Sequence, residues 1–171
     1  MSESIELSQI LRLKGEQHII IGSTGSGKTK FLQSLLHYIS TPKVIVFGFD
    51  RTEWDDQVSI FKKFGIDFKY YIGNPFENHI DSELEPSLHE LNNCVLVFDD
   101  FSLQKQNQDS FFRFANFNVR HNNITLFLIT HSLYKNNLFS KLISSSSVFV
   151  TSSLIKVYFM FQNLMNWNQL F

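Results

Sequence analysis

The sequence predicts an α/β fold in which a mainly parallel sheet carries helices on both faces. Short runs rich in β-branched and aromatic residues alternate with longer amphipathic segments, an order typical of strands joined by helical crossovers. Several of these runs are apolar at consecutive positions, which suits strands covered on both sides. With 171 residues the chain is long enough to bury one core, and we expect a single domain over residues 1–171.

The expected strands are short segments dominated by β-branched and aromatic side chains, as strands require. In chain order they are residues 18–21, 44–49, 67–72, 95–98, 124–130 and 148–151. The intervening amphipathic segments predict helices over residues 28–39, 54–64, 104–119, 133–144 and 153–165.

Three further segments complete the expected organisation. Residues 1–17 form an N-terminal extension, and residues 153–171 form a C-terminal helical segment. Residues 74–90 hold two of the three prolines and several acids, which predicts a surface connection with one short helix.

The overall charge excludes one way of binding nucleic acid. The formal net charge is -1 and the pI is about 6.6, so no global positive field draws the chain to DNA or to anionic lipid. Any DNA contact must be local or shared between subunits. The acidic start lacks the pattern of a secretory signal, and no apolar run reaches the roughly 18 residues of a membrane span, so we expect a soluble, intracellular protein that does not bind membranes.

A phosphate-binding loop follows the first expected strand. The segment fits the Walker A pattern G-x-x-x-x-G-K-S/T at every fixed position, and it consists of Gly22, Ser23, Thr24, Gly25, Ser26, Gly27, Lys28 and Thr29. Glycines let the backbone curl so that its N–H groups face phosphate oxygens at the start of a helix. Lys28 is expected to reach the β and γ phosphates, and Thr29 is expected to bind magnesium. ATP and Mg2+ are therefore the expected ligands.

The fourth expected strand ends in two carboxylates, Asp99 and Asp100, which is a Walker B pattern. Asp99 would hold magnesium at the sheet edge where ligands bind in open α/β sheets, and Asp100 would act as the general base toward water. The alternative is that the two acids cap the next helix.

Three features favour an ATPase of the RecA-like, additional-strand class. About 70 residues separate Thr29 from Asp99, which leaves room for the extra strand over 44–49 and its helix. A second acid follows the Walker B aspartate, and the strand over 124–130 ends in polar Thr130, His131 and Ser132, where a sensor of the γ phosphate would lie. The base-reading motif N-K-x-D of GTPases and an arginine-rich kinase lid are missing from the sequence.

These motifs, taken in order, resemble the viral DNA-packaging ATPases of the poxvirus and virophage type, within the FtsK/HerA superfamily. The resemblance covers residues 18–151 and rests on GSTGSGKT, then VLVFDDF, then the segment from Asn118 through Arg120 and His121 into LFLITHS. The last of these segments is the most specific.

The resemblance implies a RecA-like core that works as a homo-oligomeric ring and threads double-stranded DNA into a capsid. It implies catalytic roles for Lys28, Asp100, Arg120 and His131. Arg120 would supply positive charge to a neighbour's γ phosphate, or else pair with an acid such as Asp109. His131 would act as the sensor, or else serve only as a structural histidine.

The expected partners and location follow from the same resemblance. They are double-stranded DNA and a capsid or portal-like viral protein, in the host cytoplasm, a viral factory or the virion. His131 and Lys141 stand where the family commonly has glutamine and arginine, and lysine cannot reproduce a bidentate guanidinium. Two alternatives stay open: another nucleic-acid motor, such as a plasmid-transfer or replication helicase ATPase, and a non-motor P-loop switch or kinase.

Two residue clusters have a structural and a functional interpretation. Phe111, Phe112, Phe114 and Phe117 recur at helical spacing and are expected in the core, although such a row could also stack nucleic-acid bases. The acidic cluster after the second strand could be a metal site but is expected to begin a helix, where negative charge suits the dipole, and it consists of Asp50, Glu53, Asp55 and Asp56. Asp50 could also reach the nucleotide from its strand end. The single cysteine, Cys94, is expected to be a buried apolar side chain.

Overall fold

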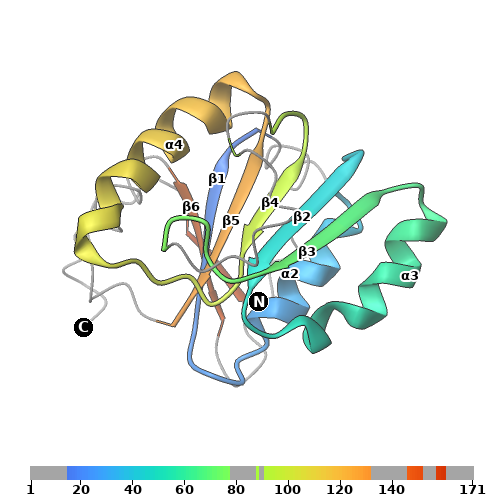
Figure 1. Ribbon diagram of the computed structural model, residues 1–171. Coiled ribbons are helices and arrows are strands. Elements are labelled where there is room, and N and C mark those ends of the chain that lie inside the picture. The colour runs from blue at the N-terminus through green and yellow to red at the C-terminus, as the bar shows by residue number, and fades with distance from the viewer. Residues whose placement is uncertain (1–14, 78–87, 89–90, 132–145, 152–156, 161–171) are drawn as a thin grey trace.

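The computed structural model describes residues 15–77, 88, 91–131, 146–151 and 157–160. These residues form a seven-stranded sheet in the order β3-β2-β4-β5-β1-β6-β7 (Figure 1). The strands are β1 (Gln17–Ile21), β2 (Lys43–Gly48), β3 (Asp67–Ile72), β4 (Val95–Phe98), β5 (Thr125–Thr130), β6 (Ser146–Thr151) and β7 (Val157–Met160).

The first six strands are parallel, and β7 pairs with β6 in the antiparallel direction. The predicted α/β class with a mainly parallel sheet is confirmed. The strand between β1 and β4 is β5, whereas the segment over 44–49, expected as the extra strand, forms β2 on the far side of β4.

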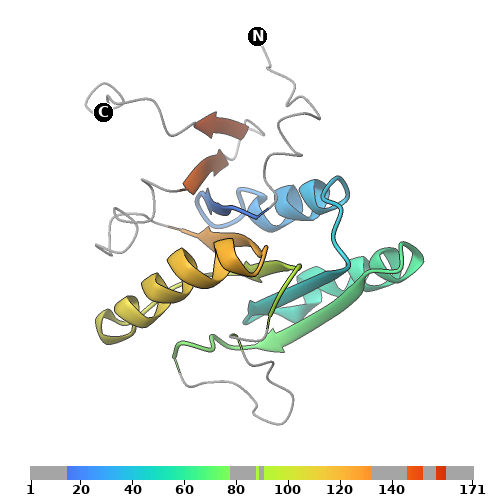
Figure 2. The ribbon, with the colours of Figure 1, turned by 90° about the horizontal axis from the view of Figure 1, so that it is seen from above.

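Helices cover both faces of the sheet, as Figure 2 shows with α4 on one side and α2 and α3 on the other. Their bounds are α2 (Lys28–Leu36), η1 (Arg51–Trp54), α3 (Asp55–Lys63), η2 (Lys105–Asn107) and α4 (Gln108–His121). Acids lie in the first turn of α3 and lysines in its last turn, an arrangement that suits the helix dipole. The helices expected over 54–64 and 104–119 thus each begin with a 3-10 turn.

Two apolar clusters, one on each face, explain why the strands are apolar at consecutive positions. Phe47 and Phe98 join the cluster beneath α4, whereas their neighbours Val46 and Val97 join the cluster beneath α2 and α3. Successive side chains of a strand point to opposite faces, so a strand covered on both faces must be apolar throughout.

The aromatic row on α4 divides between core and surface. Phe111 and Phe114 are buried in the cluster beneath α4, and Phe112 packs against that cluster. Phe117 is 66% exposed, so the expectation of a core position is wrong for this residue. The row therefore covers the sheet with one stripe, and Phe117 lies outside that stripe.

The C-terminal helical segment expected over 153–171 is wrong at Val157–Met160, which forms strand β7. These residues are β-branched and aromatic apart from the final methionine, and they pair with β6, whose outer backbone groups would otherwise lack ladder partners. The helix expected over 133–144 lies outside the described residues. In the described part of the chain, no helix has the length and apolar character needed to cross a bilayer.

The connection after β3 is anchored at its start instead of lying wholly on the surface. Asn74 is buried and donates from Nδ2 to the Ser102 carbonyl at 3.0 Å. Phe76 packs edge-on against Phe111, with ring centroids 5.1 Å apart. The short helix expected within residues 74–90 falls largely outside the described residues.

Candidate active site

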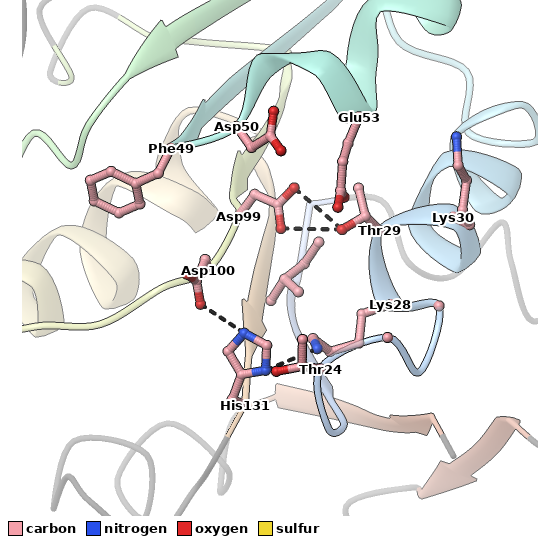
Figure 3. A pocket seen from close by; sticks show the side chains of 13 residues that line it. Thr24, Lys28, Thr29, Lys30, Phe49, Asp50, Glu53, Asp99, Asp100 and His131 are labelled. Carbon is pink, nitrogen blue, oxygen red and sulfur yellow. Dashed lines mark hydrogen bonds and ion pairs between the residues drawn. The ribbon is translucent and has the colours of Figure 1, made fainter. Parts of the chain in front are cut away.

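A cavity of about 380 Å3 opens at the carboxyl edge of the sheet, beside the ends of β1, β2, β4 and β5 (Figure 3). Ligands of open α/β sheets bind at this edge. Residues from four separate chain segments line the cavity, and they are Thr24, Gly25, Gly27, Lys28, Thr29, Lys30, Phe49, Asp50, Glu53, Asp99, Asp100, Ile129 and His131.

The loop after β1 has the backbone that a phosphate loop needs. Gly25 and Gly27 have φ of 74° and 82°, in the region that residues with a Cβ rarely adopt. No atom lies within 4 Å of a Cβ built at either position, so the backbone conformation, not crowding, requires glycine there. Helix α2 begins directly after the loop, and its free N–H groups and dipole therefore favour an anion at the cavity.

Lys28 points back across the loop and uses all three of its N–H groups. Nζ donates to the carbonyls of Gly22 and Ser23 at 3.0 Å each, and to His131 Nδ1 at 3.2 Å. Burial lowers the pKa of Lys28 below its ordinary value, while the negative charges of Asp100 and Asp99 oppose that shift. A phosphate that binds Lys28 must therefore replace at least one of these contacts.

Asp99 and Thr29 bring two hard oxygen ligands together from segments 70 residues apart. The Thr29 hydroxyl lies 3.4 Å from both carboxylate oxygens of Asp99. The Trp54 indole N–H donates to Asp99 Oδ2 at 2.9 Å. Burial raises the pKa of Asp99 above its usual range, and the hydrogen bonds from Trp54 and Thr29 act against that rise. A buried carboxylate of this kind gains from a cation.

Asp100 and His131 form a polar chain that ends at Lys28, as the dashed lines in Figure 3 show. His131 Nε2 lies 3.0 Å from Asp100 Oδ1. Because an ammonium group can only donate, His131 Nδ1 accepts from Lys28, and Nε2 then carries the proton that reaches Asp100. The histidine thus joins Lys28, the expected phosphate-binding residue, to Asp100, the expected base.

The backbone at Asp100 turns its side chain toward this chain of contacts. Asp100 has φ of 58°, a left-handed conformation that aspartate tolerates better than most residues. The residues that cap the following helices are Gln104 for η2 and Asn107 for α4. The alternative that Asp99 and Asp100 cap the next helix is therefore wrong.

Arg120 lies away from the cavity of its own chain. It is exposed in the last turn of α4, which runs from the carboxyl edge back to the amino edge of the sheet, where the Asn93 N–H donates to the Asn122 carbonyl at 2.8 Å. Asp109 is at the other end of α4, about 16 Å distant at 1.5 Å per residue, so the pairing of Arg120 with Asp109 is wrong. A role of Arg120 toward a neighbouring copy stays a prediction.

Sequence reasoning gave no role at this site to Phe49 or Trp54 and considered Glu53 only as part of the acidic cluster after β2. Glu53 and Phe49 line the cavity, and Figure 3 shows Glu53 pointing toward Thr29 and Asp99. Trp54 is fully buried and touches Asp99, although it was expected only as the first residue of a helix. Asp50 lines the cavity as expected and also caps η1 by accepting from the Thr52 N–H at 2.9 Å.

These residues fit a nucleotide with magnesium. Lys28 and the α2 terminus offer positive charge for phosphates, while Thr29 and Asp99 offer the oxygen ligands that magnesium prefers. Four carboxylates and two lysines line the cavity, so an anion can enter favourably only beside the lysines or together with a cation.

Comparison with known proteins gives information on the fold and none on the activity. No family model and no curated protein matches the sequence. A solved structure of a Pyrococcus horikoshii OT3 protein, described as a structural study of Project ID PH0250, is similar with a TM-score of 0.53 and 10% identity, over 91% of this chain and 91% of the other. The likeness supports an α/β fold for this chain.

Proposed function

We propose that the cavity binds ATP with magnesium and that the protein hydrolyses it. The observation that carries the proposal is the meeting of Lys28, Thr29, Asp99, Asp100 and His131 around one cavity at the carboxyl edge of the sheet. The structure was not needed to select these residues, because the sequence motifs had already singled them out. Their convergence is thus independent support.

Each part of the loop has a task in binding the phosphates. The backbone from Gly22 to Thr29 turns its N–H groups toward the phosphates, and Lys28 exchanges a loop carbonyl for a phosphate oxygen. Thr29 and Asp99 would hold magnesium. When bound, magnesium neutralises charge on the phosphate oxygens and polarises the bond that breaks.

Asp100 and His131 act on the water side of the reaction. Asp100 accepts the proton of the attacking water, for which its exposed carboxylate, with a side chain 61% exposed, is open to solvent. His131 donates to Asp100 and accepts from Lys28, so it can transmit the position of the γ phosphate to the base.

The strand order supports the RecA-like, additional-strand class of P-loop ATPases. In that class one strand separates the phosphate-loop strand from the Walker B strand, and here β5 lies between β1 and β4. His131, the expected sensor, directly follows β5 and lines the cavity. The arrangement favours water over a second substrate as the phosphate acceptor.

We assign the ATPase to DNA translocation on the resemblance to viral packaging motors. The proposed assembly is a homo-oligomeric ring that moves double-stranded DNA into a capsid, with Arg120 acting on a neighbour. Arg120 lies at the opposite edge of the sheet from its own cavity, so any action on a γ phosphate must be in a second copy.

A phosphate-release assay tests both halves of the proposal. The wild type should release phosphate from ATP with magnesium, stop in EDTA, and accelerate with duplex DNA, while Lys28→Ala should be inactive. Release without any response to DNA would reject the motor and keep the ATPase. Transfer of the phosphate to a nucleoside, instead of release, would identify a kinase.

A further inference from the structure

The carboxylate at the proposed magnesium position has one short side-chain hydrogen bond among the described contacts, and it comes from Trp54. The indole Nε1 donates to Asp99 Oδ2 at 2.9 Å, whereas the Thr29 hydroxyl lies 3.4 Å from each oxygen. The indole contact is therefore the stronger restraint on the carboxylate.

Trp54 is held in place by three separate elements. Its side chain is fully buried and stacks on Phe68 of β3, with ring centroids 6.1 Å apart. Asp50 caps the turn that contains Trp54, and Gln33 of α2 donates from Nε2 to the carbonyl of Glu53 at 2.6 Å. The indole thus cannot turn away from Asp99 without disturbing the core.

An indole suits a supporting role beside a metal ligand. Its N–H can only donate, so it cannot itself bind the cation. It is neutral, so it restrains the carboxylate without cancelling the charge that attracts a cation. Partners of this kind orient the groups that bind a metal, and their loss commonly costs about 10-fold to 100-fold in metal affinity or activity.

We propose that Trp54 is a positioning residue for magnesium, holding the Asp99 carboxylate in the orientation that binds the ion beside Thr29. The inference rests on the proposed function, because it assigns magnesium to Asp99 and Thr29. It adds a residue outside both sequence motifs, and it links the turn after β2 to the ion that the nucleotide brings.

The variant that isolates the contact is Trp54→Phe, which keeps a ring against Phe68 and removes the N–H. We expect the magnesium concentration for half-maximal ATP hydrolysis to rise about 10-fold. Magnesium binding to the ADP-bound protein, measured by calorimetry, should weaken by the same factor. The matched control is Phe61→Leu, a buried change in the same cluster without a contact to Asp99. It should lower the melting temperature and leave the magnesium dependence unchanged.

The hydrogen bond can also be tested by NMR in proteins that keep Trp54. The chain has two tryptophans, so a nitrogen-15 spectrum shows two indole N–H signals, and Trp54→Phe identifies one of them. In Asp99→Ala that signal should move upfield, because its acceptor is gone. This measurement needs neither nucleotide nor turnover.

The outcomes separate this inference from the proposed function. Trp54→Phe with a wild-type magnesium dependence, or an indole signal unmoved in Asp99→Ala, would overturn the positioning role and leave the ATPase standing. A wild type that neither binds magnesium with ADP nor releases phosphate from ATP would overturn both. A tenfold loss of magnesium affinity in Trp54→Phe, together with an unchanged magnesium dependence in Phe61→Leu, supports the positioning role.

Discussion

Substitution of Asp100 separates backbone strain from chemistry at one position. The residue has φ of 58°, a conformation that costs an ordinary side chain such as alanine roughly 1–2 kcal/mol and that asparagine tolerates. Asp100→Asn and Asp100→Ala both remove the carboxylate that contacts His131 at 3.0 Å. That contact is largely exposed, so its loss is worth only about 0–1 kcal/mol in either variant.

The two variants should therefore lose the same activity and differ in stability. Loss of a general base lowers turnover by about 10²-fold to 10⁴-fold. Asp100→Ala should in addition melt lower than Asp100→Asn by roughly 2–8 °C, since 1 kcal/mol shifts a domain of this size by about 2–4 °C. Both variants should bind ATP with affinities near that of the wild type.

The assay combines phosphate release, nucleotide binding and thermal unfolding on the same preparations. Glu53→Gln is the matched control, because Glu53 is a second carboxylate that lines the cavity and, unlike Asp100, points toward Thr29 and Asp99. It should keep most of the turnover. Near-normal hydrolysis by Asp100→Asn, with loss in Glu53→Gln, would refute the assignment of the base to Asp100.

Three further predictions concern the core, the cysteine and the subunit contact. Phe111→Ala should lower the free energy of unfolding by about 3–5 kcal/mol, or the melting temperature by roughly 6–20 °C, because Phe111 is buried. Phe117→Ala should change the free energy of unfolding by no more than about 0.5 kcal/mol, because Phe117 is exposed. Equal losses of stability in thermal unfolding would contradict the assignment of core and surface. Burial raises the pKa of Cys94 to about 11, so only about one thiol in a thousand is ionised at pH 8. A thiol reagent should therefore label the native protein slowly at pH 8 and faster as the pH rises toward 11. After unfolding it should label Cys94 at once. Fast labelling at pH 8 in the native state would show that this site is open. Mixing Arg120→Ala with Lys28→Ala should restore phosphate release above either variant alone, because a mixed interface joins an intact loop to an intact arginine; no recovery would argue against action across subunits.

The fold was predictable because consecutive apolar residues in a strand indicate that both faces of the sheet are covered. Val44 and Val46 lie in one cluster and Ile45 and Phe47 in the other, and four consecutive apolar residues of this kind are typical of a strand covered on both faces. The C-terminal segment was not predictable, because β7 forms by pairing with β6, and the short sequence Val157–Met160 alone does not reveal that partner.

The site was predictable where a motif fixes both residue type and spacing. Lys28 and Asp99 each lie at the cavity because the motif ties them to a strand end. Trp54 and Glu53 carry no such signal, since a 3-10 turn after β2 brings them back over the cavity and sequence spacing does not encode that turn. The position of Arg120 at the far edge follows from the direction of α4 once the strands are known to be parallel.

The most direct test of the central claim is to follow the oxygen of the attacking water. ATP and magnesium are incubated with the protein in water enriched in oxygen-18, and the released phosphate is analysed by mass spectrometry. The account predicts phosphate that carries oxygen-18 from the wild type and no release from Lys28→Ala. The account would be contradicted if the wild type left the ATP unchanged and released no phosphate. It would also be contradicted if Lys28→Ala released as much phosphate as the wild type.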